Sequence, residues 1–456
     1  MQAGRGPTSS ASAADGRERV NAASSVPRPA PAAAAWSPAS VSFSELGFAA
    51  FLGLILFGQI DAVGNRLFGL FLPVSAYSAF YLLAGGLALC AWIGDRGTRL
   101  TGIPAWGPRL ALALLLWSLL AWTLSRHGDE GWKYVQGFAK AIGLLLIAAV
   151  LVDTPRRLTA AIWTMAAAGL VSALFVYGDM ATGTRLVSTS EAATTAEYGG
   201  MPRSAGGSDE NPTTASHMLL VSATLLLGLF ATVKKARIPV AVALIFCLGA
   251  IGLMAARSAL VGLLPAAAVF LYALRKERSF PLILMGLAAL VAAAVIASPA
   301  LLDRVTALAD WARDPTLVRR TTYLAVGADL LQQSPVWGIG PGNYPLYFVG
   351  DEYRYLPGRS PVMRELHNTY LDTAVELGLV GLALFLAVLG GAIALLWSAA
   401  KTATAVSAPA FALLLALLAL AAASFFMPNK DMRYLWLLLG LAWQCGRLVH
   451  ARKAAR

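Results

Sequence analysis

Long apolar runs recur along this chain from residue 43 onward, and each is long enough, or nearly long enough, to cross a lipid bilayer. A helix needs about 20 apolar residues to span a hydrocarbon core about 30 Å thick. We therefore predict an all-α integral membrane protein with about twelve transmembrane helices. The expected spans are residues 43–60, 75–93, 110–124, 134–152, 159–177, 213–232, 238–255, 259–274, 281–298, 371–397, 408–427 and 434–449.

The composition agrees with a membrane protein and excludes several other classes. Hydrophobic residues make up 58% of the 456 residues, charged residues make up 13%, and the mean hydropathy is +0.65. A soluble domain is usually close to half apolar and about a quarter charged. A soluble enzyme, a disordered protein and a disulfide scaffold are therefore excluded. The cysteines Cys90, Cys247 and Cys445 lie far apart inside apolar runs and are expected to be packing residues.

The spans divide the chain into five parts. Residues 1–42 are rich in Ala, Ser, Pro and Arg without the apolar core of a signal peptide, so we expect a disordered cytoplasmic tail. The other parts are 43–298 (helices 1–9, with an external loop at 178–212), 299–370 (a large external loop), 371–449 (helices 10–12) and 450–456 (a cytoplasmic tail). Within the large loop, residues 317–332 carry apolar residues at helical spacing, which predicts an amphipathic helix at the membrane interface.

The basic residues indicate how the chain crosses the membrane. An even number of spans places both termini on one side, and more than half of the 36 Lys and Arg residues lie on that side. Short cytoplasmic loops are enriched in Lys and Arg, so both termini are expected in the cytoplasm. The net charge of +12 then follows from these segments, and no nucleic-acid partner is needed to explain it.

Charged residues at the external ends of the spans are the first candidates for chemistry, because a charge within a membrane is costly and usually functional. Arg257 lies in a short break between two apolar runs, and Arg203 lies in the loop 178–212. Lys140 lies about two turns inside an apolar run, and Arg320 begins the amphipathic helix. The alternative for each is a solvated residue, or one whose long side chain reaches the interface.

His367 lies where the large loop re-enters the membrane, in the stretch RELHNTYLDTAVELG. Histidine can exchange a proton near neutrality, and an arginine fork suits phosphate oxygens. A lipid-diphosphate donor and a sugar hydroxyl acceptor would need both kinds of group. A purely structural role is the alternative for His367. His217, inside the sixth span, is expected to lack such company.

A metal or nucleotide site is not expected. The four histidines are scattered without an HExxH pair, and neither a GxSxG motif, a P-loop nor a Rossmann glycine pattern is present. The stretch WGIGPGN is glycine-rich, but it follows an amphipathic segment and precedes aromatic residues, unlike a phosphate-binding loop. We expect neither a metal ion nor another cofactor.

The run SPVWGIGPGNYPLYF, followed by LHNTYLDTAVELGLVGLALFL, resembles the signature of the O-antigen ligase/polymerase family. The break MAARSAL around Arg257 resembles a further motif of that family, with Ala256 where serine is common. The residues that match the signature are Arg320, Pro335, Gly338, Gly340, Tyr344, His367, Asn368, Tyr370, Leu371, Glu376, Gly378 and Gly381. The strong part of the resemblance covers about sixty residues, and the remainder agrees only in topology.

The resemblance implies a membrane glycosyltransferase (GT-C-like) with a lipid-accessible cavity in the bacterial inner membrane. Such an enzyme would move O-antigen from undecaprenyl diphosphate to a sugar hydroxyl of lipid A–core at the periplasmic face, without metal and with inversion. Its partners would be that donor, that acceptor and membrane lipid.

The resemblance also implies roles for individual residues. Arg203 and Arg257 would bind the diphosphate, and His367 would act on the acceptor hydroxyl. Asn368 and Tyr344 would support His367, and we add Arg320 and Lys140 as further possible supports.

Other functions stay open at this point. The same signature is found in O-antigen polymerases and in ligases that glycosylate proteins, which differ in their acceptor. A twelve-helix transporter is a remote alternative, because transporters tend to have two related halves and this chain does not. The sequence does not determine the sugars, the linkage, the oligomeric state, or the roles of Lys133, Lys140 and Arg319.

Overall fold

The computed structural model describes residues 42–69, 71, 74–96, 106–187, 197–198, 201–208, 210–254, 256–287, 315–359 and 362–454. Within these ranges the fold is helical, apart from one antiparallel pair of two-residue strands, β1 Glu197–Tyr198 and β2 Met201–Pro202. The expected tail at residues 1–41 lies outside the described part of the chain.

Most of the predicted spans coincide with helices. These helices are α1 Phe43–Gln59, α3 Ala76–Gly94, α4 Trp106–Thr123, α5 Gly128–Leu151, α6 Pro155–Thr182, α8 Pro212–Thr232, α9 Arg237–Leu253, α10 Arg257–Leu274, α15 Thr369–Ala400, α16 Ser407–Ala423 and α17 Arg433–Ala454. The ninth span, 281–298, is helical as far as residue 287, and the rest of it lies outside the described residues. The helix η2 Lys234–Ala236 joins α8 to α9.

Seven of the described helices are long and apolar enough to cross a membrane. An eighth span is formed if α1 and the following helix α2 Asp61–Phe68, which are bent by 112°, count as one. α16 is apolar but shorter, with 17 residues. The fold is therefore that of a helical, multi-pass membrane protein, while the number of twelve spans stays a prediction.

Polar side chains determine where several helices begin. Ser42 and Glu45 form a capping box at the start of α1, Thr154 caps α6, and Asn211 caps α8. Each cap satisfies backbone N–H groups that have no partner inside the helix. α6 continues to Thr182, so the external loop expected from residue 178 begins about one turn later.

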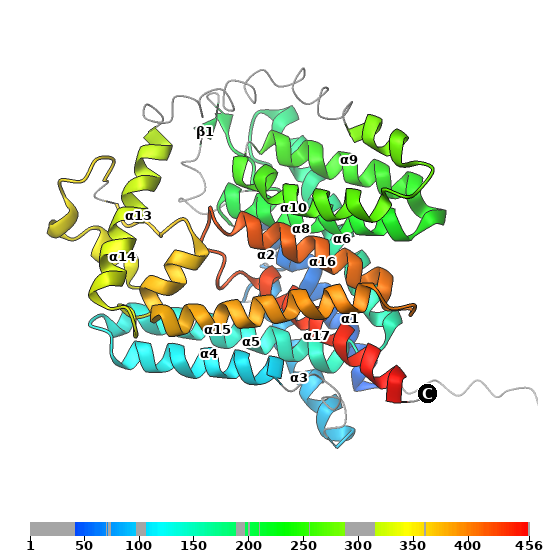
Figure 1. Cartoon of the computed structure of the whole chain (residues 1–456), viewed down its shortest axis with the longest axis horizontal. Helices are drawn as coiled ribbons and strands as arrows, with labels where there is room; N and C mark the ends of the chain where they lie inside the picture. Colours follow the sequence, from blue (N-terminus) through cyan, green and yellow to red (C-terminus); the bar gives the residue numbers. More distant parts are fainter. Residues whose placement is uncertain are drawn as a thin grey trace, which may run out of the picture. The chain divides into compact units, whose positions relative to one another are not determined.

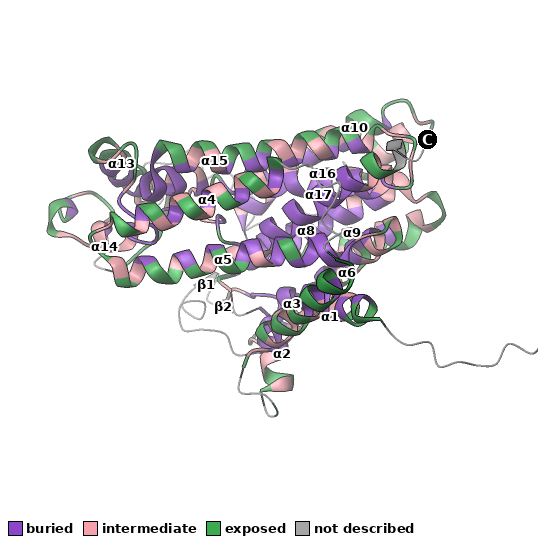
Figure 2. Cartoon of the chain, turned by 90° about the horizontal axis from the view of Figure 1, so that it is seen from below, coloured by how far each residue is buried: buried purple, intermediate pink, exposed green. Residues whose placement is uncertain are grey.

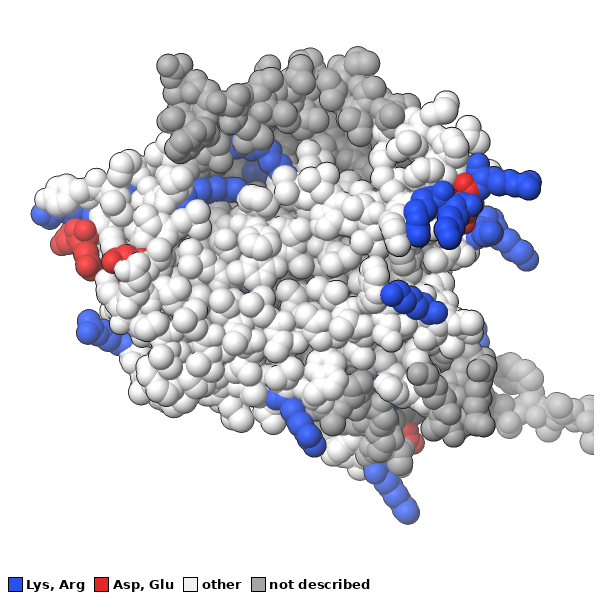
Figure 3. Space-filling model, viewed as in Figure 1, with Lys and Arg blue, Asp and Glu red and all other residues white. Residues whose placement is uncertain are grey.

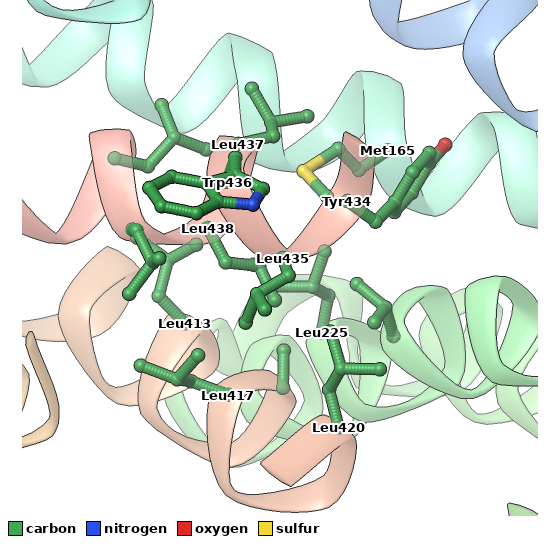
Figure 4. Close-up of a cluster of buried hydrophobic side chains, with 14 of the residues drawn as sticks. Met165, Leu225, Leu413, Leu417, Leu420, Tyr434, Leu435, Trp436, Leu437 and Leu438 are labelled. Carbon is green, nitrogen blue, oxygen red and sulfur yellow. The ribbon is translucent and has the colours of Figure 1, made fainter. Parts of the chain in front are cut away.

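The core is formed where α8, α16 and α17 meet. Trp436 of α17, Leu413 and Leu417 of α16 and Leu225 of α8 belong to one cluster of buried side chains (Figure 4). These helices are buried along most of their length (Figure 2). In the most apolar stretch of α8, 78% of the residues are buried, against 22% in α3 and in the span that contains α9. α8 is therefore a central helix, whereas α3 and α9 present apolar faces outward, as expected next to lipid.

Charged side chains avoid the middle of the face seen in Figure 3 and gather towards its edges. Large apolar residues that are exposed on α3 and α9 include Leu82, Leu83, Val242 and Ile245. An exposed apolar surface of this kind marks contact with a partner or a membrane, and the apolar spans favour the membrane.

The described part of the large loop has a small core of its own. It contains α13 Pro315–Gln333, α14 Tyr344–Phe348 and η4 Asp351–Tyr353, which Figure 1 shows at one end of the long helices. Tyr323, Val326 and Leu330 of α13 pack with residues of α14 and with Val375 of α15. The opposite face of α13 exposes Leu324, Ala325 and Ala328, so the expected interfacial position of this helix stays a prediction.

Candidate functional site

Four chain segments meet at the same end of the helices: the start of α8, the break between α9 and α10, the start of α15, and residues 424–432. We call residues 424–432 the α16–α17 loop. Several of the site residues expected from the sequence lie on these segments, and buried hydrogen bonds connect them.

The side chain of Arg203 forms hydrogen bonds to the break between α9 and α10. Its Nε and Nη2 atoms both donate to the backbone oxygen of Met254 at 3.0 Å, and Nη2 also donates to Thr213 Oγ1 at 3.4 Å. Met254 is the C-cap residue that follows α9, and Arg257 begins α10. The structure therefore brings the backbone of Arg257 and the side chain of Arg203 to the same break, although 54 positions separate them in the sequence.

His217 connects this break to the α16–α17 loop, so the expectation that it lacks company is wrong. Its Nε2 atom lies 2.8 Å from Ser258 Oγ, and its Nδ1 atom lies 3.1 Å from Asn429 Nδ2. The amide nitrogen can only donate, so Nδ1 accepts and Nε2 carries the hydrogen that is donated to Ser258. All three side chains are buried.

The α16–α17 loop is in turn bound to the start of α15. The backbone N–H of Asn429 donates to Thr369 Oγ1 at 2.7 Å, and Thr369 Oγ1 donates to the backbone oxygen of Met427 at 2.6 Å. The Thr369 N–H donates to the backbone oxygen of Ser424 at 2.8 Å. A continuous chain of hydrogen bonds thus runs from the residue after Arg257 to the residue that follows Asn368.

Asn368 determines where α15 begins and therefore where His367 lies. Its Oδ1 atom accepts from the N–H groups of Tyr370 at 3.0 Å and Leu371 at 3.1 Å. This is the geometry of a helix N-cap. The supporting role expected for Asn368 therefore has a structural basis in helix capping.

His367 is half-buried and is held in one tautomer. Its Nδ1 atom lies 2.9 Å from the backbone oxygen of Glu365, which can only accept, so Nδ1 carries the hydrogen and Nε2 keeps its lone pair. Desolvation lowers the pKa of His367 to about 4, and the positive charges of Arg320, Arg364 and Arg319 act in the same direction. The imidazole is therefore neutral at pH 7, with Nε2 as a proton acceptor.

Arg320 lies near both His367 and the α16–α17 loop. Its guanidinium lies 5.9 Å from the centre of the Phe426 ring, at the outer limit of a cation–π contact. Its charge is the largest of the three arginine contributions to the pKa of His367. Positive charge therefore surrounds the histidine, which suits an anionic group beside it.

Two other expected residues lie away from this group. Tyr344 is fully buried in the core of the large loop, where its hydroxyl donates to the backbone oxygen of Tyr323 at 3.1 Å. Tyr323 contacts the ring of His367, with 5.3 Å between ring centres, so Tyr344 reaches His367 only through Tyr323. Lys140 lines a separate cavity.

A buried cluster of charged side chains, which the sequence did not predict, connects the α16–α17 loop to α15. Lys430 Nζ lies 2.6 Å from Asp372 Oδ2 and also pairs with Glu376, and all three side chains are buried. Burial disfavours the charge of Lys430, but the two carboxylates outweigh burial and raise its pKa. The available signal was the pair Asp372 and Glu376, one helical turn apart in an apolar segment, which requires a cationic partner.

Glu376 also gives the glycine-rich stretch its role. It accepts from the backbone N–H groups of Gly342 at 2.7 Å and Tyr344 at 3.4 Å. The stretch therefore fixes the large loop on α15.

Among the described residues, no group of three or more His, Cys, Asp or Glu side chains could hold a metal ion. Arg203, Arg257 and Arg320 provide cationic side chains that could bind an anion. His367 provides a neutral imidazole that could accept a proton.

Comparison with known proteins finds a family model that matches part of the chain. A family model described as O-antigen ligase matches residues 242–386, which include Arg257, Arg320, Tyr344, His367 and Asn368. A comparison with curated proteins found no match.

Proposed function

We propose, from the premise that this chain belongs to the O-antigen ligase family, that it transfers a glycan from undecaprenyl diphosphate to a sugar hydroxyl of lipid A–core. The observation that carries the proposal is the chain of buried hydrogen bonds from Ser258 through His217, Asn429 and Thr369. It links the arginines at the break between α9 and α10 to the segment that carries His367.

The donor is bound through its diphosphate. Arg203 and Arg257 bind the phosphate oxygens, and Arg320 adds positive charge on the side of His367. Arginine suits this role because its planar fork can donate two parallel hydrogen bonds to phosphate. The lipid tail lies among the apolar spans.

His367 acts on the acceptor. Its Nε2 atom takes the proton of the acceptor hydroxyl, whose oxygen attacks the anomeric carbon of the donor from the face opposite the diphosphate. The bond between that carbon and the diphosphate oxygen breaks, undecaprenyl diphosphate leaves, and the anomeric configuration is inverted. The arginines stabilise the negative charge of the leaving group, a task that a metal ion performs in other enzymes.

The proposal includes an orientation. Both termini lie in the cytoplasm of a bacterium, the protein lies in its inner membrane, and the site faces the periplasm. The basic residues on the terminal side support this orientation.

The test uses purified full-length protein with lipid-linked O-antigen and lipid A–core, and reads the gel mobility of the lipopolysaccharide. Transfer is expected with and without EDTA. Arg257→Ala should lower transfer by at least about 100-fold, since removal of one group that stabilises transition-state charge typically costs 10²–10³-fold. Arg275→Ala, at the opposite end of α10, is the matched control and should keep normal transfer.

Other outcomes would replace the proposal. Longer lipid-linked chains without transfer to the core would indicate a polymerase, and transfer only to a secreted protein would indicate a protein ligase. Loss of transfer in EDTA would contradict the metal-independent mechanism.

A further inference from the structure

A cavity of about 420 Å³ lies beside the site, between α2, α3, α5 and the beginnings of α8 and α17. Its volume is within the range of about 300–1,000 Å³ that is usual for small-molecule sites. Its wall is rich in groups that donate and accept hydrogen bonds. The polar and charged ones are Asp61, Asn65, Ser75, Tyr77, Lys140, Glu210, Thr214, Glu365, Asp431 and Arg433.

The charges of this wall do not suit a diphosphate. Four carboxylates face two cations, and one of the cations, Arg433, is already bound by Asp61 at 2.8 Å and by Glu210 at 2.7 Å. A ligand with two or more negative charges would therefore meet a wall with an excess of negative charge. A neutral ligand with many hydroxyl groups could use the same side chains as hydrogen-bond partners.

Glu365 is suited to such a ligand. Desolvation and the nearby charge of Asp431 raise its pKa to about 7, whereas Lys430 acts in the opposite direction. Part of its surface is exposed, and it faces the cavity. Near neutrality its carboxyl group can both donate and accept a hydrogen bond, as a sugar hydroxyl requires.

One residue of the cavity wall contacts His367. The backbone oxygen of Glu365, a residue of the cavity wall, accepts the hydrogen bond from His367 Nδ1. The α16–α17 loop contributes Pro428, Asp431 and Met432 to the wall, whereas Phe426 and Asn429 of the same loop contact Arg320 and His217. The loop therefore contributes both to the acidic cavity and to the group of arginines and histidines.

We propose that this cavity is the acceptor subsite, and that it binds the neutral saccharide whose hydroxyl is glycosylated. This inference rests on the proposed function and assigns the two substrates to two places. The diphosphate of the donor is bound at the arginines, and the acceptor saccharide is bound by Lys140, Glu365 and their neighbours in the cavity.

Gly137 allows a steric test. It lies in the cavity wall on α5, and a Cβ atom at this position would meet no other atom within 4 Å. The Cβ of Gly137→Leu therefore fits, and the longer side chain is expected to fill part of the cavity, while Lys140→Gln removes a charged group from the same wall. Gly390→Leu is the matched steric control, because Gly390 is also helical and open but lies on α15. Lys133→Gln is the matched charge control, because Lys133 lies on α5 and pairs with Glu130 at the exposed surface.

Two readouts are measured on the full-length protein in detergent. The first is the binding of a neutral oligosaccharide from the outer part of the core, without its acidic sugars and phosphate groups. The second is the KM for each substrate in the transfer assay. We expect Gly137→Leu and Lys140→Gln to weaken oligosaccharide binding and raise the acceptor KM at least tenfold, with an unchanged donor KM. Both controls should behave as the wild type.

The proposal is overturned if the wild type does not bind the oligosaccharide, or if Gly137→Leu binds it normally. It is also overturned if the donor KM rises in place of the acceptor KM. If the wild type transfers no glycan, the proposed function fails, but the binding comparison between wild type and Gly137→Leu still decides whether the cavity holds a saccharide.

Discussion

At the residue scale, the environment of His367 determines what this side chain can do. The backbone oxygen of Glu365 selects the tautomer with a lone pair on Nε2. Desolvation and three arginines keep the ring neutral. The neutral imidazole retains its capacity to accept a proton, and the guanidinium groups beside it supply the positive charge for an anionic donor.

The pH dependence of transfer should report this environment. Because the pKa of His367 is lowered from 6.5 to about 4, the neutral form persists down to about pH 5 and is lost only below that. At saturating acceptor, where Glu365 of the neighbouring cavity does not limit the reaction, kcat/KM for the donor should therefore be level from pH 6 to 8 and fall as the pH drops through about 4. Arg320→Gln removes a charge that lowers this pKa, so the acidic limb should move to higher pH.

Arg319→Gln is the comparison, since the charge of Arg319 has the smallest of the three arginine effects on His367. His367→Ala should lower turnover by about 10²–10⁴-fold, the usual contribution of general base catalysis. An acidic limb that stays in place in Arg320→Gln would show that this arginine does not act on the catalytic base.

A second prediction at this scale concerns His217. In His217→Leu, the buried hydroxyl of Ser258 loses its bond to the imidazole, and the amide of Asn429 keeps only its bond to Ser424 Oγ; a buried polar group left without a partner costs about 1–3 kcal/mol. Thermal unfolding should therefore occur at a lower temperature, and kcat should fall. The acidic limb should not move, because His217 positions the site without exchanging the proton. Ser258→Ala keeps the bond to Asn429 and should have the smaller effect; an equal effect would argue against the bridge.

At the element scale, the two stretches that carry the family resemblance form one structural unit. The N–H of Ile339 donates to the backbone oxygen of Val375 at 2.9 Å, and the N–H of Leu379 donates to that of Pro335 at 2.8 Å. Gly378 interrupts α15 between them, with φ 70° and ψ 178°. The chain approaches so closely here that a Cβ on Gly378 would overlap the backbone of Val336. The large loop is thus fixed to the helix that follows His367.

Gly378→Ala should therefore disturb the site without touching a catalytic side chain. A conformation that only glycine adopts readily costs about 1–3 kcal/mol for another residue, and the overlap with Val336 adds to this. We expect a lower unfolding temperature and easier proteolysis of the large loop. Gly390→Ala is the control, because this helical position is open and alanine favours a helix. Equal stability of the two variants would mean that the interruption of α15 is not needed.

These elements also explain what the sequence could predict. Helices such as α8 and α15 follow from local hydropathy, so their positions were accessible from the amino-acid order alone. The bond between His217 and Asn429 joins residues 212 positions apart, and a single sequence contains no record of such a pairing. For the same reason the sequence identified Lys140 as a candidate but did not show that it lines a cavity apart from Arg203.

At the scale of the whole molecule, a site between helix ends requires that all of those ends lie on one side of the membrane. The beginnings of α8, α10, α15 and α17 contribute to the site or to the neighbouring cavity. The other ends of these helices lead to basic segments, including Lys234, Lys235, Arg275 and Lys276. This separation is the pattern that the positive-inside rule associates with the cytoplasmic side.

The orientation can be tested by labelling single cysteines in intact cells. The background variant replaces Cys90, Cys247 and Cys445 by serine, and it must first be shown to retain transfer. A membrane-impermeant maleimide should then label Lys133→Cys and Glu352→Cys in intact cells, because both positions are exposed on the site side. Lys276→Cys and Lys401→Cys, which are exposed at the opposite ends of α10 and α15, should react only after permeabilisation.

The reverse pattern would place the site in the cytoplasm, where a periplasmic acceptor could not reach it. If Lys133→Cys and Glu352→Cys differed in reactivity, or Lys276→Cys and Lys401→Cys did, an odd number of spans would separate the two positions of that pair. Because Lys133 and Glu352 lie on either side of the ninth span in the sequence, their common accessibility also tests whether residues 281–298 cross the membrane; the described helix reaches residue 287. If 281–298 did not cross, Glu352→Cys would be protected while Lys133→Cys still reacted.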